Sequence, residues 1–541
     1  MIIFLTILSV TLMILLPVIF AAGLRRWVMT PWILFCLGSL TFILSQVLHI
    51  PLNGWLAEIG MLSDLRGTQL PIWRDALMLG LTAGLCEELV RAGGYIFLRR
   101  FRPGWMRLRD GAMLGLGHGG IEAMLFGGVL TAAGVSALLP LQGVDLKTLG
   151  LNSEQLAALQ MQLDALFSNP AAVLVPLLER LLAMAAHVTF SLIVWRAFAH
   201  GQFRRDWYFV VVAVLYHAAL DAGVVYASVV WPELGYWIEL VLAVMILPGL
   251  IWAVWLVRKV GLGEPAGVNA PGGSAPSGWA VFWVATRKEI RQLWRTKRFL
   301  VVGAVFLLMG MGSPLLAKLT PEILGSIEGA EMFAGLIPEP TAGDAMAQYL
   351  KNISQFGFVI AVLIGMGAVA GEKERGIAAM ILSKPMPRAA FIMSKFAAQA
   401  VMYAGLFVLA AAGAYYYTVI LFGALGFGPF ALLNGLLLLW LMCCVAVSLL
   451  GSTLGGSTAA AGGIGFGLSV ALIVAGSIPQ YGALFPSGLM AWATELGFAA
   501  AGTAASASPS LALNGGAAAG ALVIIVMALV VSIGVFEQQE L

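Results

Sequence analysis

The chain has 541 residues, of which 60% are hydrophobic and 11% are charged, and its formal net charge is +3. Because an ordinary soluble domain carries about 25% charged residues, this composition excludes a water-soluble enzyme or binding protein and predicts a protein that lives in lipid. The small net charge gives no sign of a nucleic-acid partner, since the Lys and Arg residues fall in short loops and not on one face.

Apolar segments long enough to cross a hydrocarbon core of about 30 Å recur along the chain, and no alternating strand pattern competes with them. The sequence therefore predicts an all-α polytopic membrane protein of about 13 transmembrane helices in two modules, seven and six. We interpret the first helix as retained and not as a cleaved signal peptide, because it lacks a basic leading region. The first module, residues 1–260, should contain helices near 2–22, 29–48, 73–98, 110–136, 171–196, 207–230 and 236–257.

Loop charges orient these helices. Basic residues follow the first, third, fifth and seventh helices, whereas the intervening loops are sparse and lean acidic. By the positive-inside rule the basic loops are cytoplasmic, so the N-terminus should lie outside a bacterial inner (plasma) membrane. The basic loops contain Arg25, Arg26, Arg99, Arg100, Arg102, Arg107, Arg109, Arg196, Arg204, Arg205, Arg258 and Lys259.

Residues 261–278 are rich in Gly, Pro, Ser and Ala, which predicts a cytoplasmic linker between the modules. Residues 279–298 mix aromatic and basic residues as an interfacial helix does. The second module, residues 279–541, should place its C-terminus in the cytoplasm. Its six spans are expected near 299–317, 353–371, 394–423, 427–450, 457–477 and 516–536.

Four helices of the first module carry ionisable residues in the segments CEELVRAGG (86–94), GHGGIEA (117–123), ERLLAMAAH (179–187) and HAALDA (217–222). Each charge at mid-membrane costs about 2.5–3.5 kcal/mol, so something must compensate. At about 1.5 Å of rise per residue, Glu87, His118, His187 and His217 lie in nearly one plane. Gly80, Gly84, Gly111 and Gly115 allow close helix approach, so we expect the four side chains to converge.

Two interpretations of this cluster remain open. Glu87 with Arg91 could form an intrahelical ion pair, and His217 with Asp221 a hydrogen-bonded pair that holds helices together. Alternatively the cluster is a hydrolytic zinc site with neutral imidazoles as ligands and an acid beside it as base. Glu122 and Asp221 would then fix the His tautomers, whereas His49 and His200 are expected to be structural or solvated.

The motifs EExxR, GHGGxE, ER followed by HxxxS, and HxxxD resemble those of the YhfC family of intramembrane metalloproteases, which is related to the CAAX prenyl endopeptidase clan. The resemblance covers about residues 1–258 and implies a possible intramembrane metalloendopeptidase. No HExxH signature occurs. By this likeness Glu87 or Glu88 activates water, and the three histidines surround a metal or an oxyanion. The implied catalytic set is Glu87, Glu88, His118 and His217, the metal set is His118, His187 and His217, and the supporting set is Arg91, Glu122 and Asp221.

The second module contains no GxxxxGK[ST] motif, so it cannot bind ATP through a P-loop of its own. The segment GEKERGIAAMILSKPMPRAAFIMSKFAA (371–398) resembles the cytoplasmic coupling segment of ABC-transporter permeases of the type-2 exporter class. That resemblance covers about residues 279–541 and implies a separate ATPase subunit that supplies ATP, and a homodimer or a second permease. The residues expected to contact the ATPase are Glu372, Lys373, Glu374 and Arg375.

We therefore expect an ABC exporter permease fused to a metalloprotease-like membrane module. The first module could instead be a catalytically inert scaffold, which bound metal would distinguish. An ion-coupled secondary transporter is a weaker interpretation, because no inverted repeat is visible.

Overall fold

The computed structural model describes residues 1–63, 70–146, 153–199, 203–261, 278–325, 339–478, 481–502 and 514–540. Within these ranges the chain is almost entirely helical and has no strand, which confirms the all-α prediction. Twelve described helices are long and apolar enough to cross a membrane. The thirteenth expected span is α3 (Ile72–Phe101), which is 30 residues long but less apolar because it carries Glu87, Glu88 and Arg91.

The chain divides into two compact units. The first comprises residues 1–131 and 164–272, and the second comprises residues 132–163 and 273–541. Most of the expected linker, residues 262–277, lies outside the described ranges, as does His200.

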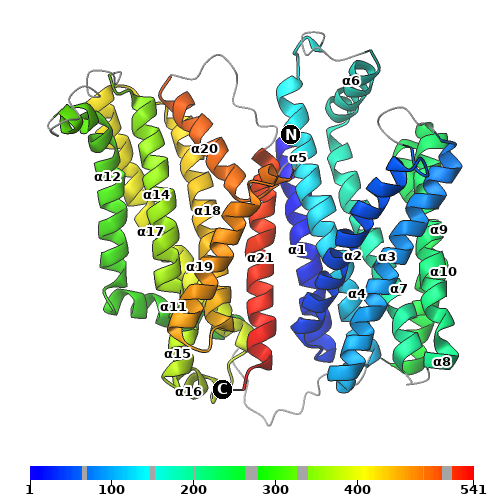
Figure 1. Cartoon of the computed structure of the whole chain (residues 1–541). Coiled ribbons are helices and arrows are strands. Elements are labelled where there is room, and N and C mark those ends of the chain that lie inside the picture. Colours follow the sequence, from blue (N-terminus) through cyan, green and yellow to red (C-terminus); the bar gives the residue numbers. More distant parts are fainter. Residues whose placement is uncertain are drawn as a thin grey trace. The chain divides into compact units, whose positions relative to one another are not determined.

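The first unit is a helical bundle, coloured blue to green in Figure 1. Within it α3 packs along α9, α2 packs along α4, and α4 packs along α7. Its main helices are α1 (Ile2–Val28), α2 (Trp32–Glu58), α3, α4 (Leu108–Glu122), α7 (Val175–Ala199), α8 (Phe203–Asp206), α9 (Tyr208–Val230) and α10 (Ile238–Val260). The short helical turns are η1 (Pro103–Trp105), η2 (Ala123–Val129), η5 (Pro170–Leu174) and η6 (Pro232–Trp237).

Glycines allow the close approach of these helices, as their spacing predicted. A Cβ atom added at Gly80 of α3 would lie 2.3 Å from the carbonyl oxygen of Ala218 on α9. One added at Gly115 of α4 would lie 2.7 Å from the Cβ atom of Ser191 on α7. Since real Cβ atoms do not approach so closely, the backbones can meet only where the side chain is a hydrogen.

The second unit contains most of α5 and a bundle that surrounds the buried helix α18. Figure 1 shows α11 lying roughly across one end of α12, as expected of an interfacial helix. Its helices are α5 (Leu130–Leu138), α6 (Ser153–Ser168), α11 (Gly278–Arg295), α12 (Arg298–Gly325), α14 (Ala342–Gly365), α15 (Ala370–Glu374), α16 (Ile377–Leu382), α17 (Arg388–Phe422), α18 (Phe427–Leu454), α19 (Thr458–Ala475), α20 (Ser487–Ala500) and α21 (Asn514–Gln538), with the short turns η3 (Leu139–Leu141) and η7 (Gly482–Leu484).

Two of these helices were not predicted. α6 has 16 residues and α20 has 14, and both fall in segments expected to be outer loops. A search for segments of about 20 apolar residues cannot detect helices of this length. In α20 the buried side chains Leu489, Trp492 and Leu496 form one stripe, so the helix is stabilised by packing and not by its length.

Candidate functional site

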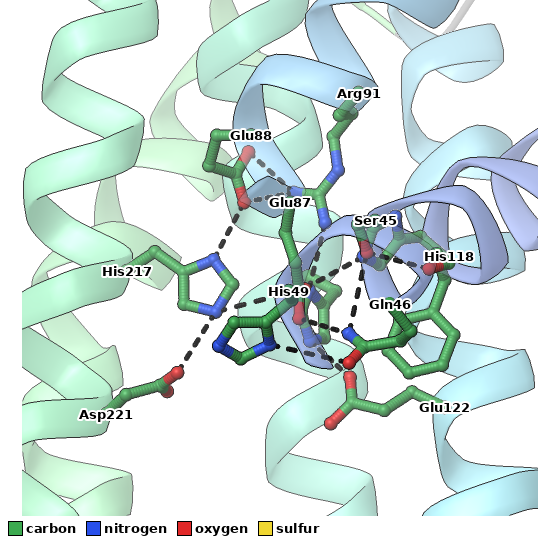
Figure 2. A network of polar contacts seen from close by, with 12 residues as sticks. Ser45, Gln46, His49, Glu87, Glu88, Arg91, His118, Glu122, His217 and Asp221 are labelled. Carbon is green, nitrogen blue, oxygen red and sulfur yellow. Dashed lines mark hydrogen bonds and ion pairs between the residues drawn. The ribbon is translucent and has the colours of Figure 1, made fainter. Parts of the chain in front are cut away.

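Four helices of the first unit bring most of the predicted site residues into one polar network whose centre is buried (Figure 2). α3 contributes Glu87, Glu88 and Arg91, α4 contributes His118 and Glu122, α7 contributes His187, and α9 contributes His217 and Asp221. The side chains of Arg91, Glu88 and His118 are fully buried. Directly after Glu122, the helix continues as the π-helical turn η2, a feature that is frequent at functional sites.

His118 of α4 contacts Glu87 of α3. Nε2 of His118 lies 3.0 Å from Oε2 of Glu87, and Nδ1 lies 2.9 Å from Oγ1 of Thr41. The Thr41 hydroxyl donates its proton to the carbonyl oxygen of Gly38 at 2.7 Å, so it accepts from Nδ1. Neutral His118 thus presents a bare lone pair at Nε2 to a carboxylate oxygen. A proton shared between these two atoms, or a metal ion, would satisfy both of them.

Glu88 has a different environment from Glu87. Nη1 of Arg91 lies 2.9 Å from both oxygens of Glu88, and Oε1 of Glu88 accepts from Nδ1 of His217 at 2.9 Å. The alternative that paired Arg91 with Glu87 is therefore wrong, because Arg91 reaches back three residues and not four. Glu87 instead accepts a hydrogen bond from the Gln46 amide at 3.0 Å.

His217 lies among three carboxylates. Because its Nδ1 donates to Glu88, its Nε2 faces Asp221 at 3.4 Å and Glu87 at 4.0 Å. The expected pair with Asp221 is present. Nε2 of His217 and Nε2 of His118 thus both face Oε2 of Glu87.

His187 is held at both ring nitrogens. Nη2 of Arg91 lies 3.0 Å from Nδ1, and Nε2 contacts Glu122. A guanidinium can only donate, so Nδ1 accepts and the proton of the neutral ring sits on Nε2. Glu122 also binds Arg180 at 2.7 Å. His187 is therefore a hydrogen-bond donor in this arrangement.

The chemistry of these donors fits a divalent metal of the zinc type. Glu87, His187 and His217 each offer a ligand atom, and these atoms lie within 4.8 Å of one another. Glu87 and His217 fit directly, since the Glu88 hydrogen bond leaves Nε2 of His217 available. His187 would have to lose its hydrogen bond to Arg91 or to Glu122 before one of its nitrogens could bind a metal. His118 contacts Glu87 and reaches the other two residues only through it.

A cavity of about 680 Å³ adjoins the network, and Glu87, His187 and His217 line it. Its other walls are largely apolar, and they include Leu79, Phe126, Leu130, Phe190, Val224 and Leu242. This combination of apolar walls and a few convergent polar groups is typical of a substrate site.

Three residues of α2 complete the site and were not predicted as part of it. Thr41 and Gln46 bind His118 and Glu87, and His49, expected to be structural or solvated, lines the cavity and contacts Asn53 and Thr82. A polar residue inside an otherwise apolar span is itself a signal of function, and Gln46 and His49 are such residues, so the sequence could have identified them.

In the second unit, the predicted coupling residues separate into two groups. Glu372 is 2% exposed, and its carboxylate binds Lys395 of α17 at 2.7 Å and Lys288 of α11 at 3.1 Å. Lys373 donates to the carbonyl oxygen of Thr453 at 2.8 Å. Glu374 and Arg375 are exposed.

Lys288 belongs to the interfacial helix α11. Burial alone would lower its pKa, but the hydrogen bonds and charges of Glu289 and Glu372 outweigh this and raise the pKa above its ordinary value. Lys288 therefore stays charged, and Glu372 ties α11, α15 and α17 together.

Two regions of the chain match known families. Residues 12–243 match the family described as YhfC intramembrane metalloprotease, and residues 283–541 match the ABC-2 family transporter proteins. The chain is 30% identical over 211 residues to an uncharacterized transmembrane protein, YxlG, of Bacillus subtilis (strain 168), covering 38% of this chain and 79% of that protein. It is 25% identical over 222 residues to an uncharacterized membrane protein, YhfC, of the same organism, covering 41% of this chain and 83% of that protein.

Proposed function

The first half of this chain belongs to the YhfC intramembrane metalloprotease family and the second half to the ABC-2 family transporter proteins. We propose that the chain joins a peptide-hydrolysing membrane module to the permease subunit of an ATP-driven exporter. The positions of its basic loops favour a bacterial inner membrane, with the N-terminus outside and the C-terminus in the cytoplasm.

The contact between Glu87 and His118 carries the proposal of hydrolysis. Glu87 can accept a proton from a water molecule, because its oxygens contact Gln46 and His118, whereas Arg91 binds Glu88. Glu88 is a poor candidate for this role, since Arg91 and His217 already bind both of its oxygens. Of the two predicted glutamates, we therefore assign the base to Glu87 and the orientation of His217 to Glu88.

His217 would hold a zinc ion with His187 or His118 as a further ligand, and Glu87 would lie beside the metal-bound water. A zinc ion bound there would lower the pKa of a bound water towards 7 and polarise a substrate carbonyl. Arg91 donates to Nδ1 of His187 and so keeps the ring proton on Nε2, which faces Glu122. Asp221 and Glu122 would orient His217 and His187.

Metal content and peptide hydrolysis of the purified chain test this proposal together. We expect about one zinc per chain, lost in His217→Ala. Glu87→Gln should lower hydrolysis by about 10²–10⁴-fold, because an amide cannot take a proton from water. Glu88→Gln is the matched control, which should alter metal affinity more than the chemical step. A folded, metal-free wild type whose hydrolysis is insensitive to Glu87→Gln would instead favour the inert scaffold.

The second unit lacks a P-loop in its sequence, so we propose that a separate ATPase supplies the free energy through contact with residues 371–390. Glu374 and Arg375 offer exposed charges there, and Met380 of α16 is 65% exposed. Such a mixture suits a short helix that docks into a groove. Two ATPase copies would clasp a homodimer of this chain or a pair with a second permease.

A further inference from the structure

The cavity of the first unit occupies one end of the bundle only. On α3 its lining residues are Leu79, Ala83 and Glu87, whereas the basic residues Arg99 and Arg100 lie at the other end of that helix.

On the other helices too, the cavity-lining residues and the basic residues lie at opposite ends. The cavity is lined by the first half of α7, and Arg196 lies near that helix's end. On α9 the lining begins at His217 and continues to Val225, away from Arg204 and Arg205 of the preceding helix α8. α10 contributes Leu242 near its start and ends with Arg258 and Lys259. The cavity therefore extends from the network away from the arginine-rich loops.

Figure 2 shows the same division within the network. Glu88 and Arg91 lie on one side of Glu87 and His217, and Asp221 and Glu122 lie on the other. Asp221 and Glu122 line the cavity, and Glu88 and Arg91 do not.

The opposite side of the network is closed by packing. Arg91, Tyr95 and Ser191 are almost fully buried, and the Tyr95 hydroxyl lies 2.6 Å from Oγ of Ser191. Ser191 in turn donates to the carbonyl oxygen of Gly111 at 2.7 Å. At Gly115 and Gly119, α4 and α7 touch so closely that an added Cβ would lie within 2.9 Å of its neighbour. No side chain could enter from the arginine-rich end without separating these helices.

We infer that the substrate reaches Glu87 from the end opposite the arginine-rich loops, which the positive-inside rule places at the outer face of the membrane. The apolar walls fit an apolar peptide segment that lies in the outer half of the bilayer, and a cavity of 680 Å³ is within the range that holds a sizeable ligand. This inference rests on the proposed function only where it calls the occupant a substrate.

Cysteine accessibility in intact cells tests the direction of access. In a chain whose native Cys36, Cys86, Cys443 and Cys444 are replaced by alanine, single cysteines are introduced at Leu79 and at Val225, which line the cavity. Val188→Cys is the matched control, because it lies one residue from His187 but lines a separate apolar hollow. A membrane-impermeant methanethiosulfonate reagent should modify Leu79→Cys and Val225→Cys from outside at least about tenfold faster than Val188→Cys. Arg102→Cys should react only after permeabilisation.

The occupant is tested by protection. A leucine-rich synthetic peptide should slow the labelling of Val225→Cys, whereas a glycine-serine peptide of the same length should not. Equal effects of the two peptides, or none, would contradict the apolar substrate class.

Two results would overturn access from the outside. In the first, Leu79→Cys and Val225→Cys are labelled only after permeabilisation. In the second, they are labelled as slowly as Val188→Cys both before and after permeabilisation. Failure of the proposed function is a separate result. Labelling from the outside without any hydrolysis would contradict the peptidase activity but support the access route. Hydrolysis with labelling from the inside would support the peptidase activity but contradict the access route.

Discussion

Nε2 of His118 faces Oε2 of Glu87 at 3.0 Å, with Nδ1 of the same ring already donating to Thr41. Thr41 therefore decides which nitrogen of His118 is available to the reacting groups, although it would not touch substrate itself. It is a positioning residue, and its contribution can be separated from that of Glu87.

Thr41→Val should lower hydrolysis by about 10–100-fold, the usual effect of removing a partner that orients a functional histidine. The valine has nearly the same shape but no acceptor, so the His118 ring is free to exchange its tautomers. Thr41→Ser keeps the acceptor and should restore most of the activity. The pH dependence of hydrolysis should change in Thr41→Val but not in Thr41→Ser. An unchanged pH profile in both variants would contradict the assigned tautomer.

Arg91 is expected to dominate the stability of the first unit. Its guanidinium is fully buried and binds both Glu88 and His187. Arg91→Ala leaves the buried Glu88 charge without its cation, which should cost about 3–5 kcal/mol. Thermal unfolding in detergent measures this change, with the loop-end variant Arg99→Ala as the control. Equal melting temperatures for the two variants would mean that another group compensates Glu88.

Gly115 should not accept a side chain. A Cβ there would lie 2.7 Å from both Cβ of Ser191 and Cα of Val188, so Gly115→Ala should separate α4 from α7 and lower the melting temperature. Gly93 lies in the middle of α3 with nothing within 4 Å of an added Cβ. Gly93→Ala should therefore be neutral or stabilising by up to about 1 kcal/mol. If Gly115→Ala were as stable as Gly93→Ala, the tight helix contact would not exist in solution.

The convergence of the site could be predicted because it depends on helix geometry. Positions such as Glu87 and His118 have a fixed depth once the helix ends are known, and the loop arginines mark those ends. Which partner each charged group takes could not be predicted. Arg91 can reach Glu87 or Glu88 by sequence spacing, and only the rotation of α3 against α7 and α9 directs it to Glu88 and His187.

The contacts that α2 makes with the site and the direction in which the cavity opens could not be predicted from the sequence either. Thr41 is a small polar residue whose role appears only when α2 packs along α4, and Gln46 stands out in the sequence although its pairing with Glu87 does not. The cavity depends on where helices separate and where glycines draw them together, which is a property of the packed bundle.

Glu372 was expected to contact the ATPase, but its side chain is only 2% exposed. Its carboxylate binds Lys288 of α11 and Lys395 of α17, and Lys395 also binds Glu289 at 3.1 Å. Glu372 can thus transmit a displacement of α15 to both helices, whereas the exposed Glu374 and Arg375 can meet a partner directly.

The two groups should therefore fail in different ways. Glu374→Ala combined with Arg375→Ala should weaken co-purification of the ATPase, because it removes the exposed charges that would orient docking. Glu372→Gln should leave co-purification intact but reduce substrate-stimulated ATP hydrolysis by about fivefold or more, since the neutral amide no longer holds Lys288 and Lys395 together. Co-purification and ATPase stimulation are measured on the same reconstituted complex, with Lys384→Ala as an exposed control in the same segment. A Glu372→Gln protein that loses its ATPase while the double variant retains it would reverse the two assignments, because the buried carboxylate would then be required for docking and the exposed charges would not.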